Sequence, residues 1–172
     1  MKDLLRYRKA LEFAIRGYHN KTRKNSNIPY IIHPLRIVHI LRFVGYNEID
    51  NEELFIAALF HDLIEDTDVK YEEIEQEFGK KIADLVLELT IPKDADKEQF
   101  FKNMSNASKE AKVIKMADRI DNLLDLDNIP WSNEKKRKYA EHGRIILQSC
   151  GDADNKLTSM LTKIVEDILN KY

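Results

Sequence analysis

The sequence has 172 residues, which is enough for one domain with a substantial core. Hydrophobic residues make up 43% of the chain and charged residues 34%, a composition that is typical of a globular protein and excludes a disordered one. The formal net charge of −2 gives no overall attraction to nucleic acids or to acidic membranes. We therefore expect a single domain over residues 1–172 that binds neither of these partners.

Apolar residues recur at the helical period through most of the sequence, and only five glycines and four prolines interrupt the pattern. The predicted helices cover, in chain order, residues 3–19, 34–44, 50–65, 70–78, 80–90, 97–104, 105–126, 132–149 and 154–171. Asp50 and Glu53 resemble a capping box at the start of the third helix, and Ser105 or Asn106 is the expected cap of the seventh. No segment alternates with period two, so the prediction is an all-α fold.

The single cysteine, Cys150, has no partner for an internal disulfide or for a cysteine-based zinc site. The N-terminal segment is charged throughout and lacks the apolar stretch of a signal peptide. No run of about 18 apolar residues is present, so no membrane span is expected. These features together predict a cytoplasmic protein.

A polar strip interrupts the apolar pattern in the segment ALFHDLIEDT, residues 58–67. On a continuous helix, His61 lies over Glu65, and Asp62 lies over Glu65 and Asp66. A histidine on an apolar helix is more often a core residue than a ligand, and an acidic run is more often a solvated helix end. Carboxylates at a helix C-terminus oppose the macrodipole, however, so a metal cation or a basic partner is expected beside them.

His33 and Asp118 supply two more candidate ligands. His33 follows two isoleucines at the start of the second predicted helix, and Asp118 borders the apolar stripe of the long helix. A carboxylate near a core is costly unless it is paired or metal-bound. Two imidazoles and two carboxylates form a nitrogen–oxygen set that suits Mn²⁺, Fe²⁺ or Zn²⁺ and leaves coordination positions for water and phosphate.

The order His33, His61–Asp62, Asp118 resembles the H…HD…D signature of HD-domain metal-dependent phosphohydrolases. The segments RKNSNIPYIIHPLRIVHIL, AALFHDLIEDTDVKYEEIEQEFG and AKVIKMADRIDNLLDL are similar to the hydrolase domain of the RelA/SpoT group, and most of all to its stand-alone small alarmone hydrolases of the metazoan SpoT-homologue type. The similarity covers nearly the whole chain. It implies an all-α HD-domain bundle of roughly eight to ten helices.

The resemblance also implies an activity, which is the Mn²⁺-dependent removal of the 3′-pyrophosphate of guanosine tetra- and pentaphosphate by a metal-activated water that attacks phosphorus. The implied metal ligands are His33, His61, Asp62 and Asp118. Glu65 and Asp66 match the family's Glu-Asp pair, which supports general acid/base handling of the attacking water.

The resemblance further implies contacts to a small-molecule nucleotide substrate. Arg23 and Lys24 match an Arg-Lys pair in the loop before His33, where arginine suits both stacking and phosphate recognition. Asn122 matches the asparagine of the ADxxxN pattern, and Lys135 and Tyr139 resemble a basic-x-x-x-Tyr pair. A solvated loop and a solvated basic helix face are the alternatives for these two pairs. Further candidates for a phosphate contact are Lys93 and Lys97.

Asp121 departs from the family pattern, in which relatives usually carry an aromatic residue or a histidine. A carboxylate beside a phosphate site repels the substrate unless it faces away or binds a cation. Two alternatives therefore stay open. One is a phosphohydrolase for another 2′- or 3′-phosphorylated nucleotide, such as an adenosine alarmone or NADPH. The other is a non-catalytic nucleotide-binding module, against which the presence of Glu65 and Asp66 argues.

Overall fold

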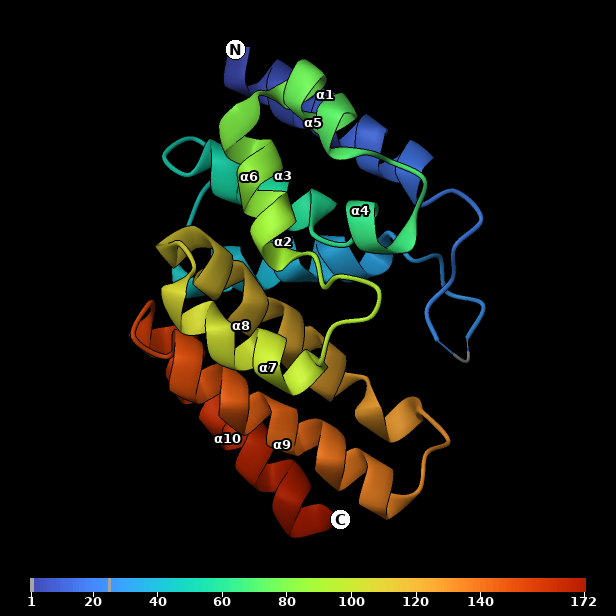
Figure 1. Ribbon diagram of the computed structural model, residues 1–172, viewed down its shortest axis with the longest axis vertical. Coiled ribbons are helices and arrows are strands. Elements are labelled where there is room, and N and C mark those ends of the chain that lie inside the picture. The colour runs from blue at the N-terminus through green and yellow to red at the C-terminus, as the bar shows by residue number, and fades with distance from the viewer. Residues whose placement is uncertain (1, 25) are drawn as a thin grey trace. The chain divides into compact units, whose positions relative to one another are not determined.

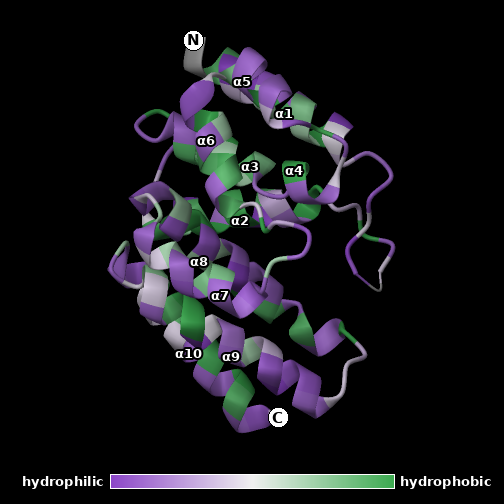
Figure 2. Cartoon of the chain, in the orientation of Figure 1, coloured by the Kyte–Doolittle hydropathy of each residue, from purple (hydrophilic) through white to green (hydrophobic). Residues whose placement is uncertain are grey.

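The computed structural model describes residues 2–24 and 26–172, and these residues form ten α-helices, two short 3-10 helices and no strand (Figure 1). The all-α prediction is therefore confirmed. The chain divides into two compact units, of which the first ends at Lys93 and the second begins at Asp94. Figure 2 shows hydrophobic and hydrophilic residues alternating along helices such as α6 and α10, as expected for helices that each bury one face.

The first unit is built around one helix that is apolar on all sides, α3 (Glu52–Phe60). Each of its residues from Leu54 to Phe60 is buried, so it forms the centre of this unit. The surrounding helices of the unit are α1 (Lys2–Gly17), α2 (Ile32–Val44), α4 (Leu63–Asp66), α5 (Tyr71–Phe78) and α6 (Lys80–Leu89). Because α1, α2 and α6 all pack against α3, the C-terminal end of α3 is held in a fixed position.

The prediction that one helix continues through residue 65 is wrong, because the helix is interrupted at His61 and Asp62. Nδ1 of His61 lies 2.9 Å from the carbonyl oxygen of Ala58, the group that would accept the N–H of Asp62 in a continuous helix. The N–H of Asp62 instead donates to the hydroxyl of Tyr18 at 3.3 Å. The side chain of His61 thus replaces the backbone N–H of Asp62 as the donor to Ala58. The next helix, α4, begins as a separate turn at Leu63.

The predicted capping box at Asp50 and Glu53 is also wrong. The N-cap of α3 is Asn51, without a capping hydrogen bond from its side chain. The carboxylate of Asp50 instead accepts a hydrogen bond of 2.8 Å from the side-chain amide of Asn47, within the turn that precedes the helix. The carboxylate of Asp50 therefore stabilises the turn before α3 and does not cap the helix.

The second unit contains a long helix, α8 (Lys109–Leu124), that packs against α9 (Asn133–Cys150) and α10 (Asn155–Lys171). Its remaining elements are α7 (Lys97–Asn103) and the 3-10 helices η1 (Met104–Asn106) and η2 (Leu126–Asn128). Ser108 caps α8 by accepting the N–H of Ala111, whereas the predicted caps Ser105 and Asn106 lie in η1. No described helix is long and apolar enough to cross a membrane.

Candidate functional site

The hydrogen bond that ends α3 also fixes the ring of His61. A carbonyl oxygen only accepts, so Nδ1 of His61 carries the proton in its contact with Ala58. The other ring nitrogen, Nε2, lies 2.9 Å from Oδ2 of Asp62. This arrangement resembles metal-binding histidines, in which one nitrogen is held by a backbone carbonyl and the other is presented to the metal.

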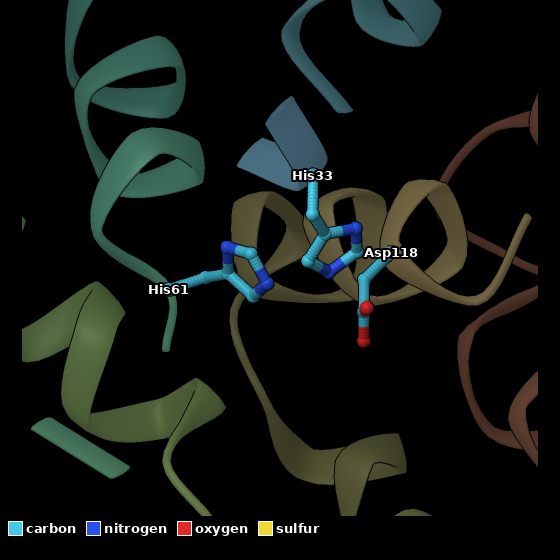
Figure 3. A group of neighbouring side chains, drawn as sticks. All are labelled: His33, His61 and Asp118. Carbon is cyan, nitrogen blue, oxygen red and sulfur yellow. The ribbon is translucent and has the colours of Figure 1, made fainter. Parts of the chain in front are cut away.

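His33, in the first turn of α2, brings a second imidazole to the same carboxylate. Its Nε2 lies 3.8 Å from Oδ2 of Asp62, and its ring centroid is 5.0 Å from that of His61. Both histidines are 1% exposed. Figure 3 draws these two rings together with Asp118 of the second unit.

The candidate ligand atoms of the first unit fit a divalent metal. A ring nitrogen from each of His33 and His61 faces one oxygen of Asp62, and all three atoms are acceptors when they carry no proton. A cation between such atoms removes their mutual repulsion. Imidazole and carboxylate ligands together suit Mn²⁺, Fe²⁺ or Zn²⁺, so the chemistry of the set supports a metal and excludes a soft-ligand cluster.

Two tyrosines that the sequence analysis did not single out hold Asp62. The hydroxyl of Tyr30 donates to Oδ2 of Asp62 at 2.5 Å, and the hydroxyl of Tyr18 accepts the N–H of Asp62. Burial and the negative charge of Asp62 raise the pKa of Tyr30 far above its ordinary value, so its hydroxyl stays a donor. The only signal in the sequence was the place of Tyr30 three residues before His33.

The predicted acid/base pair, Glu65 and Asp66, lies on the turn α4. Oε2 of Glu65 accepts the N–H of Ile91 at 2.9 Å, which ties this side chain to the segment after α6. Partial burial and then the charge of Asp62 raise the pKa of Asp66, while a hydrogen bond from Tyr30 opposes the shift. A raised carboxyl pKa makes Asp66 a better proton acceptor than an ordinary aspartate.

A cavity of about 640 Å³ in the first unit is lined by both members of this pair. Three basic residues, Arg16, His19 and Lys21, share its lining. None of these three residues has a role predicted from the sequence. The lining also includes the carboxylates of Asp68 and Glu73, so acidic side chains outnumber basic ones in this cavity.

The loop that carries Arg23 and Lys24 is closed by backbone hydrogen bonds. Thr22 and Pro29 form an isolated antiparallel bridge, and the N–H of Arg23 donates to the carbonyl of Ile28 at 2.8 Å. The guanidinium carbon of Arg23 lies 5.8 Å from the ring centroid of Tyr30, which gives this arginine a fixed platform. Lys24 is exposed.

In the second unit, Asp118 is 6% exposed and belongs to a small polar network on α8. Nζ of Lys115 lies 3.2 Å from its Oδ2, and the side-chain amide of Asn122 donates to its Oδ1. The structure thus brings two predicted site residues, Asp118 and Asn122, into contact. Asp121, the departure from the family pattern, is 3% exposed and lies on the same helix.

The predicted pair Lys135 and Tyr139 belongs to an aromatic cluster of the second unit. Nζ of Lys135 lies 4.4 Å from the ring of Trp131, and the rings of Trp131 and Tyr139 are 5.4 Å apart. The guanidinium of Arg119, another residue without a role in the sequence analysis, lies 4.5 Å from the ring of Tyr139. Each of the remaining candidates, Lys93 and Lys97, is exposed.

A sequence model described as an HD domain matches residues 10–146, well over half of the chain. The chain belongs to the HD-domain family. Its HD-domain relatives include the guanosine-3′,5′-bis(diphosphate) 3′-pyrophosphohydrolase MESH1 of Drosophila melanogaster, which is 30% identical over 92% of each chain. MESH1 of Homo sapiens is 32% identical over 88% of each chain. A bacterial relative with the same enzyme name, from Aquifex aeolicus, is 36% identical over 77% of this chain and 19% of its own length.

Solved structures agree with this HD-domain membership. A metazoan orthologue of SpoT that is described as hydrolysing ppGpp matches with a TM-score of 0.86 and 28% identity over 94% of both chains. The lmo0812 structure from Listeria monocytogenes has a TM-score of 0.67 at 24% identity, which shows a shared fold. The expected HD-domain fold and the resemblance to RelA/SpoT-type hydrolases are therefore confirmed.

Proposed function

We propose that this HD-domain protein is a Mn²⁺-dependent hydrolase that removes the 3′-pyrophosphate of guanosine tetra- and pentaphosphate. The observation that carries the proposal is the approach of His33 and His61 to one oxygen of Asp62, with Glu65 and Asp66 on the next turn. Relatives that carry the name of this enzyme match the chain over most of their own length.

Asp118 of the second unit is the fourth proposed ligand. It is a buried carboxylate, it matches the last residue of the H…HD…D pattern, and the family match runs through both units. Lys115 supports this carboxylate with a charge-assisted contact. A bound Mn²⁺ would supply Lewis acidity toward a phosphate oxygen and lower the pKa of a water molecule.

The proton transfers belong to the acidic pair. Asp66 accepts a proton from the attacking water, and its raised pKa makes it a better proton acceptor than an ordinary aspartate. Glu65 orients the water, because the hydrogen bond from Ile91 restricts the position of its carboxylate. The oxygen of the water forms a bond to phosphorus, the bond between this phosphorus and the 3′-oxygen breaks, and Asp66 passes its proton to the departing 3′-oxygen. The products are pyrophosphate and the nucleotide with a free 3′-hydroxyl.

Cationic and aromatic side chains recognise the substrate. Arg23 stacks on the base with its guanidinium fixed over Tyr30, and Lys24 contacts phosphate. The other substrate contacts are Asn122, Lys135, Tyr139 and one of Lys93 and Lys97. Hydrogen bonding between Asn122 and Asp118 supports a place for this amide beside the metal. The single buried cysteine supports the cytoplasm as the compartment.

Turnover of three nucleotides by the purified protein with Mn²⁺ tests this function. Guanosine tetraphosphate, NADPH and a 3′-phosphorylated adenosine nucleotide are compared by chromatography of their products. The proposal predicts pyrophosphate and GDP from guanosine tetraphosphate at the highest kcat/KM. Faster turnover of NADPH or the adenosine nucleotide would replace the proposed substrate, and tight binding without turnover would indicate a non-catalytic module.

A further inference from the structure

Tyr30 contacts residues from both halves of the proposed machinery in the first unit. Its hydroxyl donates to Oδ2 of Asp62 at 2.5 Å, and its ring centroid lies 5.8 Å from the guanidinium carbon of Arg23. The rings of Tyr30 and His33 also pack nearly at right angles, with their centroids 5.7 Å apart. One side chain thus reaches a candidate metal ligand through its hydroxyl and a candidate substrate contact through its ring face.

The hydroxyl determines where the carboxylate of Asp62 points. Oδ2 of Asp62 is the atom that both histidines approach, and Tyr30 donates a hydrogen bond to this same oxygen. A carboxylate without such a donor samples several rotamers about its side-chain bonds. Hydrogen bonds to ligating carboxylates hold the ligand in place, and their loss typically lowers metal affinity about 10- to 100-fold.

The ring of Tyr30 is itself held in place from several directions. Its backbone N–H donates to the carbonyl of Lys21 at 2.9 Å, and its carbonyl accepts the N–H of His33 at 2.9 Å. The ring of Tyr18 packs against it with centroids 5.1 Å apart. Arg23 therefore rests on a platform that is fixed to the same segment as the first candidate ligand.

We propose that Tyr30 is a positioning residue that couples the substrate loop to the metal site, with its hydroxyl orienting Asp62 and its ring face orienting Arg23. This inference rests on the proposed function, because it needs a metal at Asp62 and an anionic nucleotide at Arg23. It assigns separate roles to two parts of one side chain, so two substitutions separate them.

The experiment compares Tyr30→Phe, which removes only the hydroxyl, with Tyr30→Leu, which also removes the aromatic face. Tyr71→Phe is the matched control, because the hydroxyl of Tyr71 likewise donates to an aspartate, Asp84, at 2.8 Å on α5 and α6. Mn²⁺ affinity is measured by calorimetric titration, and KM for guanosine tetraphosphate is measured at saturating Mn²⁺. Thermal unfolding of the metal-free proteins checks that each variant folds.

Tyr30→Phe is expected to weaken Mn²⁺ binding about 10- to 100-fold with an unchanged KM at saturating metal. Tyr30→Leu is expected to weaken Mn²⁺ binding equally and to raise KM about three- to tenfold, because Arg23 loses its platform. If Tyr30→Leu does not fold, Arg23→Gln in the Tyr30→Phe background tests the ring contact from the other side and should raise KM.

Equal Mn²⁺ affinities of the wild type and Tyr30→Phe would overturn the role of the hydroxyl. An unchanged KM in Tyr30→Leu, or in Arg23→Gln where Tyr30→Leu does not fold, would overturn the role of the ring. A wild-type protein that binds no Mn²⁺ would overturn the proposed function together with this inference. Mn²⁺ binding in the wild type with no effect of either Tyr30 substitution would overturn this inference alone.

Discussion

Nδ1 of the His61 side chain forms a hydrogen bond of 2.9 Å with the carbonyl oxygen of Ala58, and this contact ends the central helix of the first unit. The same contact places the ring proton on Nδ1. The other nitrogen, Nε2, then faces Oδ2 of Asp62 at 2.9 Å. The break in the helix and the orientation of the candidate ligand therefore have one cause. Asp62, released from the helical hydrogen-bond pattern, is held by two tyrosine hydroxyls.

Asp62→Ala should remove stoichiometric Mn²⁺ and all metal-dependent turnover, because both histidines of the first unit face this one carboxylate. Metal content after chelation and reconstitution, measured by mass spectrometry of the eluted metal, checks this outcome. Asp84→Ala is the matched control, since its carboxylate is bonded to Tyr71 and Lys80 on another face of the unit. Full activity and metal content in Asp62→Ala would show that the site is assigned wrongly.

Glu65→Gln should keep its metal and lose turnover. The amide oxygen still accepts the N–H of Ile91, so the local structure is preserved, whereas the amide lacks the negative charge with which the carboxylate orients the water. We expect kcat to fall about 10²- to 10⁴-fold with unchanged Mn²⁺ affinity. Single-turnover hydrolysis measures the rate, and Glu72→Gln, an exposed position on α5, is the control. Loss of metal together with rate would instead make Glu65 a ligand.

Asp66→Asn should stabilise the metal-free protein at neutral pH. The pKa of Asp66 is raised in the folded state, so the folded protein holds this proton to higher pH than the unfolded chain. The contribution of Asp66 to stability is therefore present at acid pH and is lost as pH rises through the folded pKa. Thermal unfolding with a chelator should show a higher midpoint for Asp66→Asn at pH 7, and this gain should disappear toward about pH 4. A gain that is independent of pH would point to packing instead.

Arg119→Met should leave the fold intact and weaken substrate binding. Arg119 is 4% exposed, and its Nε and Nη1 have no hydrogen-bond partner among the described residues. Replacing such a buried charge with an apolar side chain of similar length is often neutral or stabilising. The loss of the cation beneath Tyr139 should raise KM for an anionic nucleotide by roughly tenfold. A lower melting temperature with an unchanged KM would show that Arg119 acts only in packing.

Most of the fold follows from local patterns in the sequence. The helical class was predictable because apolar residues recur at the helical period, and the ends of helices such as α9 and α10 are set by nearby caps. Ser132 accepts the N–H of Lys135, and Asp154 accepts that of Leu157. Caps of this kind lie within three residues of the groups they satisfy, so they are local signals, although the caps predicted at Asp50 and at Ser105 or Asn106 were wrong.

The geometry of the site was less predictable, because it depends on partners that are distant in the sequence. The H…HD…D pattern predicted which residue types bind a metal. It contained no sign that His61 would interrupt a helix, because this requires Tyr18 to accept the N–H of Asp62 from 44 positions away. The contact between Tyr30 and Asp62, 32 positions apart, leaves no periodic signal either. Side chains that hold a ligand, unlike the ligands themselves, have no fixed spacing.

The appearance of pyrophosphate from guanosine tetraphosphate, followed by phosphorus NMR before and after addition of Mn²⁺ to chelator-treated protein, tests the central claim most directly. We predict no reaction in the metal-free protein, and stoichiometric pyrophosphate and GDP once Mn²⁺ is added. The Asp62→Ala variant, treated in the same way, should stay inactive after Mn²⁺ is added. Pyrophosphate release without metal, or none from a wild-type protein that has bound Mn²⁺, would contradict the account.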